Sequence, residues 1–153
     1  MDLKPDDKAP AFKLATGGGE ITLAKLKGKP FVMYFYPKDN TSGCTREAID
    51  FSKHIKKFAA LGVAVVGVSK DSAASHEKFA LKHKLKVTLA SDPETETAQS
   101  YGVWIEKSLY GKKYMGMERA TFLVDGKGVI RQIWRKVKVE GHAQAVLVAA
   151  SSL

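Results

Sequence analysis

The sequence is poor in cysteine, because Cys44 is the only one among its 153 residues. A single thiol excludes a disulfide within the chain, and it excludes a Cys-x-x-Cys redox pair, which would need a second cysteine at position 41 or 47. The sequence also lacks a run of 18 apolar residues and an apolar segment near its start, so it predicts neither a membrane span nor a secretion signal. These absences together favour a cytoplasmic location, where thiols stay reduced.

Acidic residues are fewer than basic ones, and the net charge is +9 at neutral pH. The basic residues occur singly or in small groups from Lys4 to Lys138, without an arginine cluster or interleaved aromatic residues. This pattern favours a solvated basic surface that steers anions, rather than a nucleic-acid-binding surface. We expect no nucleic-acid partner and no membrane contact.

Strand patterns recur along the chain and alternate with helical ones. Apolar runs predict buried strands at 31–36, 63–69, 87–90, 120–124 and 129–134. An N-terminal β-hairpin is expected from 12–14 and 20–23, which flank three glycines. The alternation predicts an α/β fold with a mixed central sheet and helices on both faces, built as a single domain over residues 1–153.

Helical periodicity places four helices between these strands. They are expected at Thr41 to about Leu61, 73–85, 94–101 and 139–150. Residues 102–117 show neither strand nor helix periodicity and predict a long irregular loop, a kind of segment that is often functional or mobile.

Cys44 lies at the junction between the strand at 31–36 and the helix that follows it. With Thr41 as N-cap, the threonine hydroxyl accepts from a backbone N–H of the first turn, and Cys44 is the third helical residue. The positive end of the helix dipole favours the thiolate there. An apolar stripe lies on the same side of the helix and comprises Ala48, Phe51, Ile55, Phe58 and Ala59. The thiol is therefore expected to point inward, partly sheltered from water.

The stretch PKDNTSGCTRE, residues 37–47, resembles the active-site motif of the peroxiredoxins through Pro37, Thr41, Cys44 and Glu47. The longer run YPKDNTSGCTREA is similar to the bacterioferritin comigratory protein (PrxQ) branch, as are GVW at 102–104 and ERATFLVD at 118–125. The resemblance implies a thioredoxin-like fold and thiol-dependent reduction of hydrogen peroxide and organic hydroperoxides through a sulfenic acid. A purely structural buried cysteine would not account for four motif residues at fixed spacing.

Peroxide reduction needs hydrogen-bond donors for both peroxide oxygens and a positive charge near the sulfur. We expect Thr41 to orient the peroxide and the backbone N–H groups of Gly43 and Cys44 to donate to it. The helix start thus supplies the nucleophile and part of its binding site.

The resemblance implies that Arg119 stabilises the thiolate and the transition state. Glu47, one turn after the cysteine, is expected to orient Arg119 or another cation. Pro37 is expected to restrict the backbone and shield the thiol from water. From position alone, Arg119 could equally be a surface arginine, and Glu47 a first-turn acid that favours the helix dipole.

Two departures from the family pattern concern positions near the cysteine. Ser42 stands where most of the branch has proline, and serine is tolerated at a helix start. Ile49 and Ala80 occupy the two places where the branch often carries a second, resolving cysteine. The chain is therefore expected to be a one-cysteine enzyme that depends on an external thiol, such as thioredoxin, glutaredoxin or glutathione. A monomer is expected, with weak dimerisation as the alternative.

Other functions fit the sequence less well. His76 and His83 share a helix face, but no carboxylate or thiol completes a metal site, so no metal and no cofactor are expected. A Cys-His hydrolase would need a histidine tied to the cysteine motif, and none is. The alternative from another class is a binding or chaperone-like protein that keeps the fold without peroxidase turnover.

Overall fold

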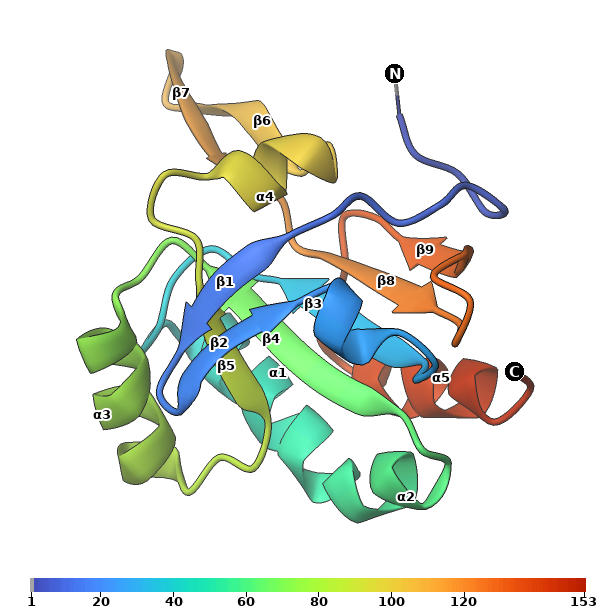
Figure 1. Cartoon of the computed structure of the whole chain (residues 1–153). Helices are drawn as coiled ribbons and strands as arrows, with labels where there is room; N and C mark the ends of the chain where they lie inside the picture. The colour runs from blue at the N-terminus through green and yellow to red at the C-terminus, as the bar shows by residue number, and fades with distance from the viewer. Residues whose placement is uncertain (1) are drawn as a thin grey trace.

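The computed structural model describes residues 2–153 and has a mixed sheet at its centre (Figure 1). Its strands are β1 (Lys13–Thr16), β2 (Gly19–Thr22), β3 (Phe31–Phe35), β4 (Ala64–Ser69), β5 (Thr88–Ser91), β8 (Ala120–Val124) and β9 (Ile130–Trp134). The helices are α1 (Ser42–Lys53), α2 (Ile55–Ala60), α3 (Ala73–His83), α4 (Glu96–Ser100) and α5 (His142–Ala150), with a short 3-10 helix, η1 (Ala24–Leu26). The seven strands lie in the order β2-β1-β5-β4-β3-β8-β9. The expected α/β class, mixed sheet and N-terminal hairpin are confirmed.

Strand β3 is the inner strand on which the active-site helix depends. All five of its residues are buried, as the continuous apolar run predicted. It pairs parallel with β4 on one side and antiparallel with β8 on the other, and β4 pairs parallel with β5. The strand-helix-strand connections predicted from the sequence are therefore present, with α1 and α2 leading from β3 to β4 and α3 leading from β4 to β5.

Alternate side chains of β3 enter two separate hydrophobic cores. Phe31, Met33 and Phe35 pack with residues of the N-terminal segment, η1 and α4. Val32 and Tyr34 pack on the other face with α1, α2, α3 and α5. Helices thus cover both faces, although four of the five lie on the face that carries Cys44.

The prediction of an irregular loop over 102–117 is wrong. These residues form a second, two-stranded sheet of β6 (Trp104–Leu109) and β7 (Lys112–Met117), which stands away from the main sheet (Figure 1). The two-residue turn places Tyr110 and Gly111 at φ values of 50° and 79°, the left-handed conformation of a tight hairpin turn. Tyrosine is an unusual residue for that position, and most side chains of the hairpin are at least partly exposed, so neither turn chemistry nor apolar alternation revealed it.

Several helix boundaries differ from the sequence prediction, including the end of α3, which lies at His83 and not at residue 85. The helix expected from Thr41 to Leu61 is interrupted at His54, which has non-helical dihedral angles and separates α1 from α2. After this break Ala59 is exposed and is not part of the apolar stripe. The helices α4 and α5 are also shorter than predicted, and α5 begins only after Gly141.

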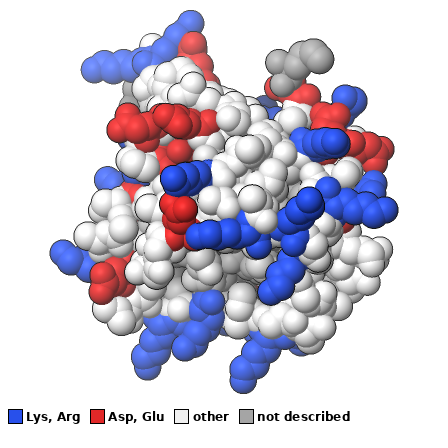
Figure 2. All heavy atoms as spheres, viewed as in Figure 1, with Lys and Arg blue, Asp and Glu red and all other residues white. Residues whose placement is uncertain are grey.

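Basic side chains are spread over the face of the molecule shown in Figure 2, with acidic side chains between them. This distribution follows the scatter of lysines along the sequence. Within residues 2–153, no helix combines the length and the apolar character that crossing a membrane would require.

Gly67 of β4 lies directly against Tyr34, and the contact leads to a prediction about stability. A methyl group at position 67 would lie 2.6 Å from the phenol oxygen. Tyr34 cannot retreat, because it is fully buried and stacked on Phe51 with ring centroids 4.6 Å apart. We expect Gly67→Ala to lower the free energy of unfolding by about 2–3 kcal/mol, measured by urea denaturation. Gly17→Ala, whose added methyl meets nothing within 4 Å, is the control, and equal stability of the two variants would contradict the prediction.

Candidate active site

Cys44 is the third residue of α1, as predicted, and its side chain faces the core beneath that helix. Only 1% of the residue is exposed, so the thiol is more deeply buried than the partial shelter expected from the sequence. The first backbone hydrogen bond of the helix runs from Thr45 N–H to Thr41 O at 2.9 Å. The N–H groups of Gly43 and Cys44 precede it and have no carbonyl partner within the helix. They are therefore available to an oxygen placed at the helix start.

Arg119 brings a positive charge to the sulfur from a distant part of the chain. Its Nη2 donates to Cys44 Sγ at 3.3 Å, and its Nη1 donates to Glu47 Oε1 at 2.7 Å. The sheet explains the meeting, because Ala120 of β8 lies opposite Phe35 at the end of β3 from which the chain leads into α1. One guanidinium thus joins α1 to the start of β8.

Gly43 makes room for this guanidinium. A Cβ at position 43 would lie 3.2 Å from Arg119 Nη2, a closer approach than ordinary side-chain packing allows. The glycine before the cysteine therefore lets the arginine reach the sulfur across the first turn of the helix.

Burial disfavours the charged forms of both Glu47 and Arg119. Burial raises the pKa of Glu47 to about 7, even though the charge and hydrogen bond of Arg119 pull it down. Burial also disfavours the charged guanidinium, but Glu47 and Cys44 outweigh that effect and raise the pKa of Arg119. The second oxygen of Glu47, Oε2, is buried without a hydrogen-bond partner. The carboxylate is thus costly to bury and is held by one side chain.

The capping role predicted for the Thr41 hydroxyl is wrong. Thr41 has the extended backbone of an N-cap, but its Oγ1 donates to Lys38 O at 2.9 Å and accepts from no N–H of the first turn. The carbonyl of the preceding loop is the nearer partner, and the hydroxyl keeps its lone pairs free. Pro37, which begins this loop, is exposed, and its shielding of the thiol stays a prediction.

A buried polar network, which the sequence did not reveal, holds the loop between β3 and α1. Asp39 accepts from Tyr36 Oη at 2.6 Å and from Ser75 Oγ at 2.9 Å, and it lies 2.7 Å from His76 Nδ1. Its own N–H donates to Asp71 at 2.8 Å. Most of these partners lie more than 30 residues from Asp39 along the chain, so no short sequence motif indicated the network. It ties the loop that carries Pro37 to α3 and to the end of β4.

Two of the four histidines, His76 and His142, are held in buried hydrogen bonds away from the thiol. His76 binds Asp39 and the carbonyl of Ala90, and His142 lies 2.7 Å from Thr121 Oγ1. Burial and the charge of Arg119 lower the pKa of His142 to about 4, so its imidazole is neutral near pH 7. Among residues 2–153 no group of three His, Cys, Asp or Glu side chains could hold a metal ion, and no histidine hydrogen-bonds to Cys44.

The backbone around Arg119 is fixed on both sides of the residue. Arg135 donates to both oxygens of the buried Glu118 at 2.9 Å and to Gly102 O at 2.8 Å. The Arg119 carbonyl accepts from Val137 N–H at 3.0 Å. Burial raises the pKa of Glu118, but its hydrogen bonds outweigh burial and hold that pKa below the usual value. Arg119 is therefore presented from a short connection between β7 and β8 that is held on both sides.

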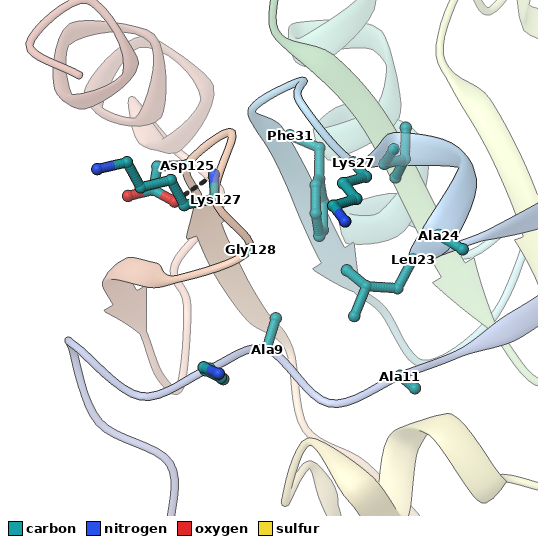
Figure 3. A pocket seen from close by; sticks show the side chains of 11 residues that line it. Ala9, Ala11, Leu23, Ala24, Lys27, Phe31, Asp125, Lys127 and Gly128 are labelled. Carbon is teal, nitrogen blue, oxygen red and sulfur yellow. Dashed lines mark hydrogen bonds between the residues drawn. The ribbon is translucent and has the colours of Figure 1, made fainter.

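An apolar pocket of about 360 Å³ lies at the other end of β3 (Figure 3). Its lining includes Phe31, the first residue of β3, together with Leu23 and Ala9. It contains neither the cysteine nor Arg119. The chemistry of the thiol is therefore confined to the end of the sheet at which α1 begins.

Comparisons with known proteins agree on one family. The AhpC/TSA family matches residues 5–133. Peroxiredoxin Bcp of Bacillus subtilis is 45% identical to this chain over 148 residues, which covers 96% of this chain and 94% of the relative. These values exclude a chance likeness of the cysteine motif alone.

Solved structures give the same result for the fold. The bacterioferritin comigratory protein of Xanthomonas campestris, studied for alkyl peroxide reduction, superposes with a TM-score of 0.88 at 42% identity, covering 92% of this chain and 90% of that one. A PrxQ of Xylella fastidiosa, solved as a cysteine-to-serine mutant, superposes with a TM-score of 0.93 at 33% identity, covering 99% and 98%. The Xanthomonas protein has also been solved with serine in place of each of two different cysteines, whereas this chain has one.

The raised pKa of Glu47 leads to a prediction about stability and pH. Its folded-state pKa of about 7 exceeds the ordinary 4.5, so the folded protein binds this proton more tightly than the unfolded chain. The stabilisation is complete below about pH 4.5 and is lost as the pH rises through 7. Glu47→Gln keeps an acceptor for Arg119 but cannot ionise. We therefore expect the free energy of unfolding of the native protein to fall relative to that of the variant by about 2 kcal/mol between pH 5 and 8.

Urea denaturation at several pH values and constant ionic strength would measure this difference. Glu77→Gln removes an exposed carboxylate from α3 and is the matched control. A difference between the native protein and Glu47→Gln that does not change with pH would contradict the prediction.

Proposed function

The chain belongs to the AhpC/TSA family and is a peroxiredoxin, a thiol-dependent peroxidase, and we propose that Cys44 is the residue that attacks the peroxide. The observation that carries the proposal is the 3.3 Å contact between Cys44 Sγ and the Arg119 guanidinium at the start of α1. A cation in this position favours the thiolate, which is the nucleophilic form of cysteine. We propose hydrogen peroxide and organic hydroperoxides as substrates, in line with the alkyl peroxide reduction studied in the Xanthomonas relative.

In the first half-reaction the thiolate attacks the terminal oxygen of the hydroperoxide and the O–O bond breaks. The sulfur becomes a sulfenic acid, and the other oxygen leaves with a proton as water or an alcohol. The N–H groups of Gly43 and Cys44 donate to the peroxide, and Thr41 accepts from its hydroxyl with the lone pairs that its bond to Lys38 leaves free. Arg119 stabilises the charge that builds on the leaving oxygen.

Glu47 and Pro37 support these groups. The 2.7 Å bond from Arg119 to Glu47 fixes one arm of the guanidinium, so that the other arm stays on the sulfur. The burial of Glu47 under α1 makes it a positioning residue rather than one that meets substrate. Pro37 begins the loop that the Asp39 network holds in place, and we assign it the role of limiting access of water to the thiol.

The second half-reaction uses a thiol from outside the chain. Peroxiredoxins in general use thiol reductants, and Ile49 and Ala80 stand here where the branch often has a second cysteine. The sulfenic acid condenses with an external thiol, releases water and forms a mixed disulfide, which a second thiol then reduces. Thioredoxin, glutaredoxin and glutathione are the candidate reductants. Because Cys44 is almost fully buried, pairing of two Cys44 thiols is disfavoured, and we propose a monomer acting as one domain in a reducing cytoplasm.

Removal of the guanidinium tests the role of Arg119. We expect Arg119→Ala to slow peroxide attack by tens of times or more, about 2–4 kcal/mol for one charged donor, and to move the pH profile of the reaction to higher pH. Stopped-flow kinetics with hydrogen peroxide would measure both effects. Arg131→Ala, which removes an arginine paired with Asp125 at the molecular surface, is the control. An unchanged rate and profile would show that Arg119 has only a structural role.

The one-cysteine mechanism predicts the products of oxidation. After one equivalent of hydrogen peroxide, intact-mass spectrometry should show a monomer that has gained one oxygen atom, and excess peroxide should add a second. Added thiol should restore only the first product, because sulfinic acid resists reduction by thiols. Cys44→Ser should show no gain and no turnover.

A non-reducing gel completes this test. A dominant disulfide-linked dimer at micromolar protein would show that a second subunit supplies the resolving thiol. Turnover by Cys44→Ser above the uncatalysed rate would remove Cys44 from the reaction altogether.

A further inference from the structure

Lys107 of β6 is a half-buried lysine whose ammonium lies near the active site. Its Nζ donates to the carbonyl of Met117, two residues before Arg119. Within residues 2–153 it forms no ion pair with a carboxylate, unlike Lys113 on the same hairpin, which pairs with Glu106. A lysine that gives up water without gaining a carboxylate partner carries a cost that packing alone does not explain.

The path of the lysine stem is determined by Gly116 on the neighbouring strand. A Cβ at position 116 would lie 3.1 Å from Lys107 Cδ and 3.3 Å from its Cε, so the absence of a side chain there leaves the stem its room. The stem crosses β7 at this point and delivers the ammonium to Met117. Met117 is the last residue of β7, so the bond lies within the hairpin, at the end from which the chain continues to Arg119. The hairpin stands apart from the main sheet (Figure 1).

Two of the charged groups that act on Lys107, Arg119 and Cys44, belong to the candidate active site. Burial lowers the pKa of Lys107 and the charge of Arg119 lowers it further, whereas Cys44 and Glu118 act in the opposite direction. Tyr114 is its cross-strand neighbour on β7. The ammonium thus lies within the electrostatic reach of Arg119 and Cys44, at the backbone two residues before Arg119.

We propose that Lys107 is a positioning residue of the peroxidase, which adds a second positive charge to the field at Cys44 and holds the backbone that presents Arg119. The proposal rests on the proposed function of Cys44 and Arg119 and adds to it the β6–β7 hairpin, which otherwise has no part in the reaction. Arg119 touches the sulfur directly, whereas Lys107 acts through its charge and through Met117 O.

The single cysteine provides a direct test that does not require peroxidase turnover. The rate of Cys44 alkylation by iodoacetamide, measured from pH 4 to 10, reports the fraction of thiolate without interference from another thiol. We expect Lys107→Met, which keeps the stem over Gly116 but removes the charge, to move this profile upward by about half a pH unit to one unit. The rate of peroxide attack at neutral pH should fall about threefold to tenfold. Lys107→Arg should restore most of both.

Lys112→Met is the matched control, because Lys112 is exposed on the same hairpin and its loss changes the net charge equally. Near-UV circular dichroism would verify that the variants fold, and Lys107→Gln replaces Lys107→Met if the latter does not. In an Arg119→Ala background the loss of Lys107 should have a smaller effect on the alkylation profile. Lys107 then no longer acts by holding the backbone that presents the guanidinium, and only its charge remains.

The outcomes separate this proposal from the function on which it rests. An alkylation profile of the Lys107 variant that matches the Lys112 control would overturn the proposal, even if peroxide turnover is normal. A shifted profile in a protein that does not turn over peroxide would instead refute the proposed function and leave Lys107 as a tuning group of the thiol.

Discussion

The guanidinium of Arg119 is the contact on which the site depends. It binds the sulfur with one nitrogen and the buried Glu47 with another, and so joins the first turn of α1 to the start of β8. A side chain at position 43 would crowd the guanidinium, which passes there. The pairing of β3 with β8 brings Arg119 close to Cys44, because it places the end of β3 beside the start of β8.

A buried carboxylate close to the sulfur opposes the negative charge that a thiol-dependent peroxidase needs there. Its value lies in geometry, because Glu47 fixes a side chain that would otherwise have several rotamers. The cost appears in the pKa of Glu47, which burial raises to about 7. Burying Glu47 therefore lowers the stability of the fold, and in return the Arg119 guanidinium is held in one position, as is common at functional sites.

The sequence predicted what depends on local pattern. The apolar run of β3 and the position of Cys44 as the third residue of α1 followed from periodicity and spacing, and the contact of Glu47 with Arg119 followed from the family resemblance. The hydrogen bond of the Thr41 hydroxyl and the β6–β7 hairpin could not be predicted from local pattern. The Thr41 hydroxyl had two acceptable partners, and only the folded loop decides for Lys38 O. The position of Lys107 depends on β6–β7 pairing, which the exposed side chains of the hairpin conceal.

The network around Asp39 has a kinetic consequence in a chain with one thiol. It ties the loop before α1 to α3, and no segment of the chain has to travel to Cys44 to close a disulfide. Regeneration is then an encounter between two molecules, and its speed scales with the concentration of the incoming thiol. Because only 1% of Cys44 is exposed, the helix start must also open to admit that thiol, and this opening sets an upper limit to the speed of recovery.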